Sequence, residues 1–291
     1  MSLYVPYNLP AIGTVHAEGL PVFGGIPNGV KPLRILLLNL MPIKETTELD
    51  FIRMLAPEDE EVELILMKIA GLTYKNTSEQ HMNAFYRDFE SLRDEYFDGF
   101  IVTGTPVEHL PFEEVRYWKQ LEEIFEWVRS HVRSSLYICW GSQAGLYHYY
   151  GIPKYHIPQK MFGVYEQTIL KREEALFTGM RSSLRMPQSR HTEIRRTDLD
   201  KVKDLTILAE SPESGVAIVK ARQREFFITG HLEYAIDTLH NEYFRDLGKG
   251  LPIQMPKNYY PDNDASHTPS FSWHNDALLF YHNWIKYYVH P

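Results

Sequence analysis

The single cysteine of the chain, Cys139, stands where a strand is expected to turn into a helix. The apolar stretch 135–138 precedes it and the small-residue stretch 141–145 follows it. A sharp turn of this kind is a nucleophile elbow, which exposes the side chain at the top of a sheet. The partial positive charge at the start of the helix favours a thiolate, and the Trp140 backbone N–H is expected to face a developing oxyanion. The alternative is an inert, buried thiol.

A second group, His231 and Glu233, follows the expected strand 225–229. A nucleophilic thiol needs a base to take its proton, and that base needs a carboxylate to orient it. The pair alone is a weak signal, because the chain has 13 histidines. Together with the elbow at Cys139, it predicts a catalytic triad.

Composition excludes several other classes of protein. The 291 residues include 30 Lys and Arg against 38 Asp and Glu, which gives a formal net charge of −8 and argues against general nucleic-acid binding. No apolar run is long enough to span a membrane, and the Met1 end has no basic-then-apolar signal, so we expect a cytoplasmic protein. One cysteine allows no intramolecular disulfide and no thiolate zinc cluster, and no metal site or phosphate-binding glycine loop is expected.

Strand and helix patterns alternate through the first half of the chain. Strands are expected at 33–40, 62–67, 97–104 and 135–138, and helices at 44–55, 79–92, 112–132 and 141–150. Further strands are expected at 162–170, 205–209, 215–220 and 225–229, followed by helices at 234–247 and 276–288. Long apolar strands suit a sheet that is buried on both faces. We therefore expect an irregular N-terminal arm over 1–30 and a single α/β domain over 31–291, with a mostly parallel central sheet flanked by helices.

Both groups together resemble the class I glutamine amidotransferase-like superfamily, with its flavodoxin-like fold. The chain resembles more closely the MetA family of homoserine O-acyltransferases, from about residue 33 to the end. The stretches that carry this resemblance, in chain order, are 38–42 with Lys44 and Glu48, 98–108, 112–118, 138–147, 187–193, 230–234 and 237–246.

The resemblance implies a role for each matching residue. Cys139 becomes an acyl-thioester, His231 is the general base and Glu233 orients it. Arg245 grips the carboxylate of an amino acid, as a planar fork of donors can; without the resemblance, a surface ion pair would be the preferred interpretation. The resemblance also places Lys160 and Ser189 at substrate-binding positions, and Lys44 beside the active site with its role left open.

Glu108 occupies the position at which this family divides. A small residue there accompanies succinyl transfer, and Glu accompanies acetyl transfer. The physical reason is that a carboxylate in the acyl pocket repels the free carboxylate of a succinyl group but not an acetyl group. The alternative is a loop Glu that faces water.

Several residues depart from the family pattern near the acceptor site. Gln188 replaces a usual His, Leu232 replaces Pro or Ser, and the pair at 49–50 is Leu-Asp. One methylene separates L-homoserine from L-serine, and it is worth only about 1–3 kcal/mol in a pocket, so these departures leave the acceptor open.

The resulting hypothesis is a ping-pong O-acetyltransferase that uses acetyl-CoA as a substrate, needs no cofactor or metal, and acetylates L-homoserine for methionine biosynthesis. Alternatives with the same chemistry are L-serine as acceptor, for cysteine biosynthesis, and succinyl-CoA as donor. Alternatives of another class are a glutaminase or γ-glutamyl hydrolase and a non-catalytic binding module. No nucleic-acid or membrane partner is expected, and a homodimer is left open.

Overall fold

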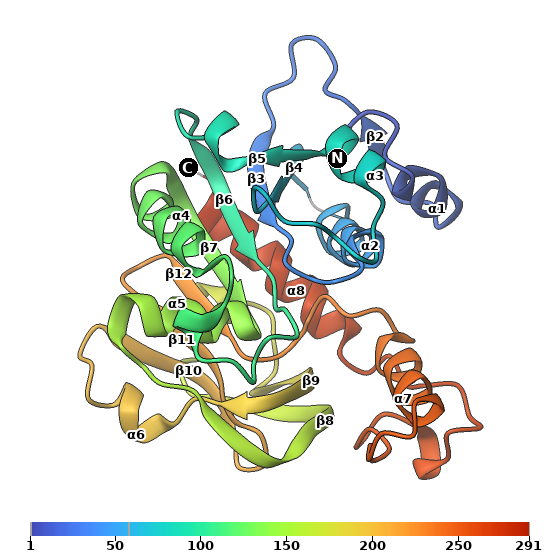
Figure 1. Ribbon diagram of the computed structural model, residues 1–291, viewed down its shortest axis with the longest axis vertical. Helices are drawn as coiled ribbons and strands as arrows, with labels where there is room; N and C mark the ends of the chain where they lie inside the picture. The colour runs from blue at the N-terminus through green and yellow to red at the C-terminus, as the bar shows by residue number, and fades with distance from the viewer. Residues whose placement is uncertain (1, 58, 291) are drawn as a thin grey trace.

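A single twisted sheet forms the centre of the computed structural model, which describes residues 2–57 and 59–290 (Figure 1). The sheet has twelve strands. Hydrogen-bonded neighbours follow the order β2-β1-β4-β3-β6-β7-β12-β11-β10-β8-β9, and the twelfth strand, β5, pairs with β4. Parallel pairings outnumber antiparallel ones. The predicted α/β class with a mostly parallel sheet is confirmed.

The parallel half of the sheet consists of apolar strands that are buried on both faces. Its central members are β4 (Val62–Lys68), β3 (Leu33–Leu38), β6 (Phe97–Val102), β7 (Val132–Ile138) and β12 (Glu225–Ile228). Parallel strands of this kind need helices on each face, because neither face can be left in water. The carboxyl ends of β6, β7 and β12 meet at one edge, which is where the predicted nucleophile lies.

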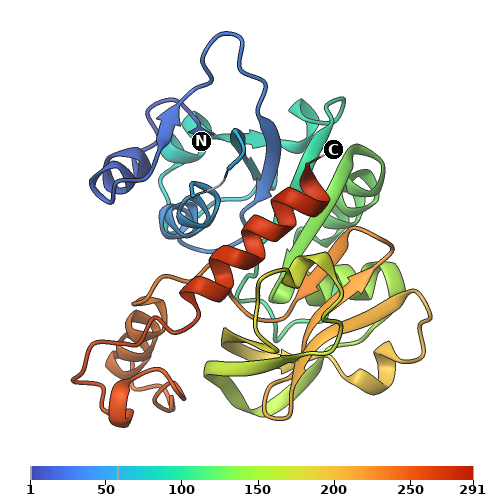
Figure 2. The same ribbon diagram turned by 180° about the vertical axis from the view of Figure 1, so that it is seen from behind.

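Helices cover both faces of this half. The face that carries Ile35 and Leu37 packs against α2 (Lys44–Leu55) and α8 (His274–Trp284), which crosses the sheet diagonally in Figure 2. The face that carries Leu36 packs against α4 (Trp118–His131) and α5 (Trp140–Tyr150). Alternation of side chains along the strand therefore divides the core into two layers.

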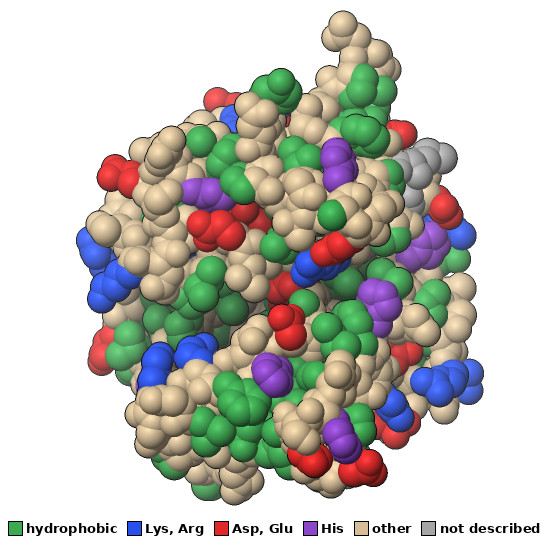
Figure 3. Space-filling model, turned by 90° about the vertical axis from the view of Figure 1, so that its right-hand side faces the viewer, with side chains coloured by type: hydrophobic (Ala, Val, Ile, Leu, Met, Phe, Trp, Pro, Cys, Tyr) green, Lys and Arg blue, Asp and Glu red, His purple; other side chains and the backbone are tan. Residues whose placement is uncertain are grey.

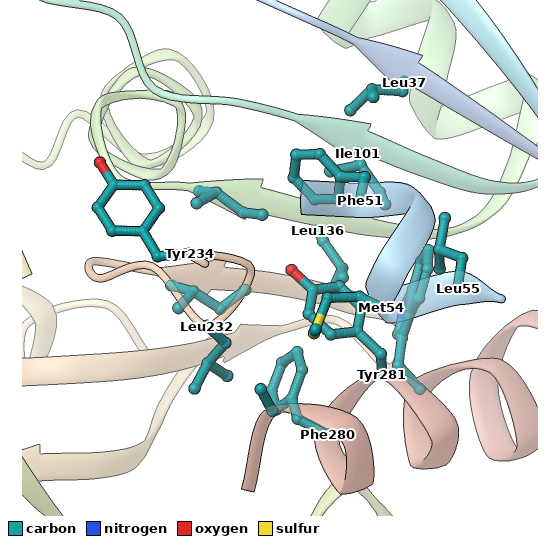
Figure 4. Packing of buried hydrophobic residues seen from close by; sticks show 14 of the residues in the cluster. Leu37, Phe51, Met54, Leu55, Ile101, Leu136, Leu232, Tyr234, Phe280 and Tyr281 are labelled. Atoms are coloured by element: carbon teal, nitrogen blue, oxygen red, sulfur yellow. The ribbon is translucent and has the colours of Figure 1, made fainter. Parts of the chain in front are cut away.

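Close packing holds α2 and α8 on the sheet. Phe51 of α2 meets Tyr281 of α8 edge to face, with ring centroids 6.3 Å apart. Figure 4 shows these two rings together with the strand residues Leu37, Ile101 and Leu136. Each apolar side chain of this size contributes about 1.5–3 kcal/mol to the stability of the fold when it is fully buried.

The antiparallel half extends the sheet beyond β12. It contains β8 (Tyr155–Ile169), β9 (Ser183–Glu193), β10 (Leu205–Ser211) and β11 (Gly215–Ala221). The helix α7 (Thr238–Gly248) lies near the ends of β8 and β9 in Figure 1, on the side of the molecule that also carries α2. Figure 3 shows this side, which is hollowed between its upper and lower parts, with hydrophobic side chains on the walls of the hollow.

The expectation of an irregular arm over 1–30 is wrong for the residues described there. This segment forms β1 (Leu3–Val5), α1 (Ala11–Ala17) and β2 (Val22–Gly24). The reason is tertiary: β1 adds to the free edge of β4, with Leu3 opposite Val62. An unpaired edge of a sheet is a ready template for another strand.

The helices expected over 79–92, 112–132 and 234–247 begin later or end earlier than expected, and the strands β5 (Tyr86–Asp88) and β9 were not predicted. The helix expected over 79–92 is α3 (Glu79–Phe85) and stops because Tyr86 pairs with Leu66 of β4. The helix expected over 112–132 begins only at Trp118, after a separate turn. The strand β9 was missed altogether.

The remaining elements are short. They are β5 (Tyr86–Asp88), α6 (Arg196–Leu199), the 3₁₀ turns η1 (Phe89–Ser91), η2 (Phe112–Glu114), η3 (Ala175–Phe177) and η4 (Pro261–Asn263), and the π-helical end of α8, η5 (Ile285–Val289). Within residues 2–57 and 59–290, no helix has both the length and the apolar character that a membrane span requires.

Candidate active site

Cys139 sits in a strained turn between β7 and α5. Its backbone has φ 53° and ψ −118°, a conformation that residues with a Cβ rarely adopt. Two contacts hold it there: its N–H donates to the Ile228 carbonyl at 2.7 Å, and its carbonyl accepts from the Ser142 hydroxyl at 2.7 Å. Strain of this kind collects at functional sites, and here it forms the predicted nucleophile elbow.

Two glycines allow the elbow to approach the end of β6. A Cβ on Gly141 would lie 2.8 Å from the Thr103 carbonyl oxygen, so α5 can start this close to β6 only with glycine there. A Cβ on Gly104 would lie 3.4 Å from the Cys139 Sγ and 3.6 Å from the Trp140 backbone nitrogen. Gly104 therefore packs directly against both the thiol and the amide predicted to face an oxyanion. As the first residue of α5, Trp140 has an N–H that no carbonyl of the helix can accept.

His231 and Glu233 reach the elbow from the end of β12. The His231 N–H donates to the Pro187 carbonyl at 2.9 Å, and the ring Nδ1 lies 2.6 Å from Glu233 Oε1. Since Nδ1 faces Glu233, Nε2 is the ring nitrogen left for the thiol of Cys139, whose charge acts on the ring and raises its pKa. All three side chains are buried. The structure thus brings together the three residues predicted as a triad, in the order nucleophile, base and orienting carboxylate.

The environment of His231 favours its protonated form. Burial lowers the pKa of the ring, but the charges of Cys139 and Glu233 and the hydrogen bonds to both outweigh burial, so the pKa lies well above its usual value. Tyr234 stacks on the ring with centroids 4.0 Å apart and planes at 12°. His231 is therefore fixed in orientation and holds its proton to a higher pH than a solvated histidine does.

Arg190 is a buried cation near the thiol that the sequence reading did not single out. Its side chain is 2% exposed and donates to the Gln188 Oε1 at 3.0 Å and to the carbonyls of Thr192 and Ser214 at 2.6 and 2.5 Å. Burial lowers the pKa of Arg190, and the negative charge of Cys139 opposes that effect. Gln188, one of the departures from the family pattern, thus accepts a hydrogen bond from a buried guanidinium that lies within electrostatic range of Cys139.

Asp50 forms an outer layer behind the triad. It is 4% exposed on α2 and lies within electrostatic range of Glu233. Its Oδ1 and the Oε2 of Glu233 are both buried without a hydrogen-bond partner among the described residues. Burial and the Glu233 charge raise the pKa of Asp50 well above its usual value. Asp50 is therefore best accommodated as a neutral acid.

The predicted substrate-binding residues meet around Glu242, which was also missed. Lys160 of β8 lies 2.5 Å from the Glu242 carboxylate, and the Ser189 hydroxyl of β9 donates to both of its oxygens at 2.9 Å. Arg245, one turn farther along α7, lies 3.6 Å from Glu242 and donates to Asp246 at 2.7 Å. Its side chain is 53% exposed, so its donors can reach a ligand. Two cations, Lys160 and Arg245, thus lie beside the Glu242 carboxylate.

Tyr234 connects this charged group with the triad. Burial comes first among the causes that raise the pKa of its hydroxyl, followed by the charges of Glu242 and Cys139. The ring therefore lies within electrostatic range of both groups while stacking on His231.

Glu108 does not project freely into water. It is partly buried, and its Oε1 accepts the His191 backbone N–H at 3.2 Å. The Lys154 ammonium donates to the carbonyls of Glu108 and Leu110 and so fixes the loop after β6. Burial raises the pKa of Glu108, although His191 and the charges of His109 and Lys160 act in the opposite direction. The carboxylate thus lies close to Lys160 of the charged group.

Lys44 supports the loop after β3. Its ammonium donates to the carbonyls of Asn39 and Met41 at 2.6 and 2.8 Å. Burial lowers its pKa to about 8, while the charges of Glu48 and Glu45 oppose the shift. In the same loop, the Leu40 N–H donates to the Thr103 hydroxyl, next to Gly104. Lys44 therefore acts on the site through this loop.

Comparison with known proteins decides the family. The sequence model of the family described as HTS, homoserine O-succinyltransferase, matches residues 2–291. The chain belongs to the homoserine O-succinyltransferase family. It is 51% identical to a homoserine O-acetyltransferase of Parabacteroides distasonis, over 100% of this chain and 95% of the relative. It is 50% identical to a homoserine O-acetyltransferase of Bacteroides thetaiotaomicron, over 100% of this chain and 96% of the relative. This member of the homoserine O-succinyltransferase family is an acyltransferase, as the sequence predicted.

Solved structures place the family in a larger group of folds. A glutamine amidotransferase from Thermotoga maritima matches with a TM-score of 0.59 at 13% identity, over 90% of this chain and 100% of its own. A glutamine amidotransferase from Methylobacillus flagellatus matches with a TM-score of 0.55 at 13% identity, over 89% and 95%. The predicted class I glutamine amidotransferase-like fold is confirmed.

Proposed function

We propose that the chain transfers acetyl from acetyl-CoA to the side-chain hydroxyl of L-homoserine by a ping-pong mechanism. One observation carries this proposal: Cys139, in its strained elbow, lies within electrostatic range of the buried ring of His231, whose Nδ1 is 2.6 Å from Glu233 Oε1. The chemistry takes acetyl-CoA as a substrate and draws no step from a metal or cofactor. We place the reaction in methionine biosynthesis and in the cytoplasm, where a nucleophilic thiol stays reduced.

In the first half-reaction, the Cys139 sulfur attacks the thioester carbonyl of acetyl-CoA. The carbonyl oxygen becomes an oxyanion, for which the backbone N–H of Trp140, at the start of α5, is the proposed donor. The tetrahedral intermediate then loses the CoA sulfur, and His231 supplies the proton that this sulfur takes up. The raised pKa of His231 suits this role, because the ring holds that proton to a higher pH than a solvated imidazole does.

In the second half-reaction, His231 is neutral and acts as the base. Its Nε2 takes the proton of the acceptor hydroxyl while the oxygen attacks the acetyl carbonyl on Cys139. Collapse of the second intermediate releases the O-acetyl amino acid and returns the sulfur as a thiolate, with the proton on His231. Glu233 stabilises the imidazolium in both halves through its 2.6 Å contact with Nδ1.

The charges around Glu242 fit the acceptor. The guanidinium of Arg245 matches the carboxylate of an amino acid, and the Glu242 carboxylate matches its ammonium group. Lys160 and Ser189 fix Glu242 in place. Relatives at 51% and 50% identity are named homoserine O-acetyltransferases, and this supports L-homoserine over L-serine as the acceptor.

Glu108 fits an acetyl donor. It is partly buried, so a second carboxylate brought by a succinyl group would meet the like charge of Glu108 in a medium less polar than water. An acetyl group carries no such charge. The side chain therefore selects by repulsion.

Steady-state kinetics with the purified chain test this function. We expect kcat/KM for L-homoserine to exceed that for L-serine by at least tenfold with acetyl-CoA, since one methylene is worth about 1–3 kcal/mol. The kcat/KM for acetyl-CoA should likewise exceed the kcat/KM for succinyl-CoA. Hydrolysis of L-glutamine, with no transfer from acetyl-CoA, would replace the proposal with a glutaminase.

A further inference from the structure

Two histidines gather beside Glu108 at the mouth of the proposed acyl pocket. Glu108 and His109 come from the loop after β6, and His191 comes from β9. One ligand atom from each of these three residues lies within 4.8 Å of the others. Neither imidazole has a part in the acetyl-transfer mechanism.

Contacts around the three side chains hold them in place. The His191 backbone N–H binds the Glu108 carboxylate at 3.2 Å, which keeps that carboxylate beside the His191 ring. The His109 ring lies 5.1 Å from the His191 ring and stacks on His156 with centroids 5.6 Å apart and planes at 6°. Lys154 pins the loop through the Glu108 and Leu110 carbonyls. The cluster is thus supported from several elements.

The donor set matches one class of ion. Two imidazole nitrogens and one carboxylate oxygen, with a fourth position open to solvent, form the usual ligand set of Zn²⁺ outside thiolate sites. Bonds of about 2.0–2.2 Å require tetrahedral donors about 3.4 Å apart, so the three donor atoms, which lie within 4.8 Å of one another, draw closer together when an ion binds. Calcium and magnesium prefer oxygen ligands only.

The neighbouring cations are largely compensated. Lys160 lies 2.5 Å from Glu242 and 3.9 Å from Asp246, and its charge is matched by theirs. The Lys154 ammonium is held on backbone carbonyls and remains positive. A divalent ion therefore meets one uncompensated cation nearby, which moderates its affinity.

The geometry points to a transition-metal site, formed by Glu108, His109 and His191, at which Zn²⁺ closes the acyl-donor pocket. The bound ion takes the Glu108 carboxylate as a ligand and ties the loop after β6 to β9. The acyl group of the donor then loses access to the space in front of Glu108. The inhibitory consequence rests on the proposed acetyl transfer, whereas metal binding does not.

Calorimetric titration of the full chain with Zn²⁺ tests the site. It is carried out in the Cys139→Ser background, because a thiolate beside an imidazole is itself a zinc ligand. We expect one saturable ion per chain, bound at least tenfold more weakly after His109→Asn or His191→Asn. The exposed His267, outside the cluster, provides the matched control, and His267→Asn should leave the affinity unchanged. Absence of saturable binding, or binding unaffected by both cluster variants, would overturn the site.

Inhibition is measured separately, in chains that retain Cys139. Zn²⁺ should slow acetyl transfer at a concentration at least tenfold lower in the unmodified chain than in His109→Asn. Equal sensitivity of the two chains would overturn pocket closure. A chain that binds Zn²⁺ at the cluster but never transfers acetyl, even with a chelator present, would contradict the proposed function and leave the metal site standing.

Discussion

The backbone N–H of Cys139 donates to the carbonyl of Ile228 at 2.7 Å, and this bond ties the predicted nucleophile to the strand that leads to its predicted base, His231. Ile138 and Ile228 are register partners in the parallel pair β7 and β12, so the two strands end level with each other. Cys139 follows one strand directly, and His231 follows the other after a short turn. Parallel pairing thus places both side chains at the same edge of the sheet.

Replacing Glu233 with Gln should lower kcat by about 10²-fold or more, because the imidazolium loses its stabilising charge and its fixed tautomer. The Glu233 charge raises the pKa of His231, so its removal lowers that pKa. The basic limb of the pH profile of kcat/KM for acetyl-CoA should therefore move to lower pH. A basic limb at an unchanged pH would show that Glu233 does not act on His231.

Replacing Glu108 with Gly should admit succinyl-CoA. We expect the ratio of kcat/KM for succinyl-CoA to that for acetyl-CoA to rise about tenfold to a hundredfold. Glu108→Gln is the matched control, since it removes the charge and keeps the size. If charge repulsion excludes succinyl-CoA, the ratio should rise in both variants. A rise in Glu108→Gly alone would mean that the size of the side chain excludes succinyl-CoA. An unchanged ratio in both variants would mean that other residues select the donor.

Arg245→Lys should raise KM for the amino-acid acceptor about tenfold and change kcat little, because an ammonium cannot bind a carboxylate with two parallel hydrogen bonds. The nearby Lys249 is an exposed cation at the end of the same helix, and Lys249→Gln serves as the control for a general loss of charge. An acceptor KM that stays normal in Arg245→Lys would mean that another residue holds the carboxylate.

Asp50→Asn should stabilise the chain at high pH. Because burial and Glu233 raise the pKa of Asp50, the folded state binds that proton more tightly than the unfolded state does. The free energy of unfolding therefore falls as pH rises from the usual pKa of an Asp toward the raised value, and the loss persists above it. The Asn variant should have a Tm higher by about 2–4 °C or more at pH 8. The exposed Asp94→Asn is the control, and a lower Tm for Asp50→Asn at pH 8 would show that the charged form is needed.

Local sequence patterns predicted the core of the site. The apolar strands before Cys139 and His231 and the glycine after the nucleophile are short-range signals, and the parallel sheet follows from them. The strand β9 was missed because Pro187 interrupts it, and proline within an apparent strand argues against that assignment. The expected arm over 1–30 failed for a different reason, since β1 depends on an edge of β4 supplied by residues far along the chain.

The residues that surround the predicted site could not be predicted from the sequence, because their positions depend on contacts between distant segments of the chain. No local pattern shows that Arg190 is buried, since its partners include the carbonyl of Ser214 on another segment. Glu242 is held in position by hydrogen bonds from Lys160 and Ser189, which belong to two different strands. In the same way, the contact between Glu108 and His191 joins residues 83 positions apart.

Intact-mass measurement of the chain after incubation with acetyl-CoA alone tests the central claim most directly. The account predicts that the chain gains the mass of one acetyl group, that peptide mapping places it on Cys139, and that L-homoserine removes it as the O-acetyl product. Cys139→Ala should fold and gain nothing. Formation of product from both substrates at full rate, with no acetyl-enzyme detected after acetyl-CoA alone, would contradict the thioester mechanism.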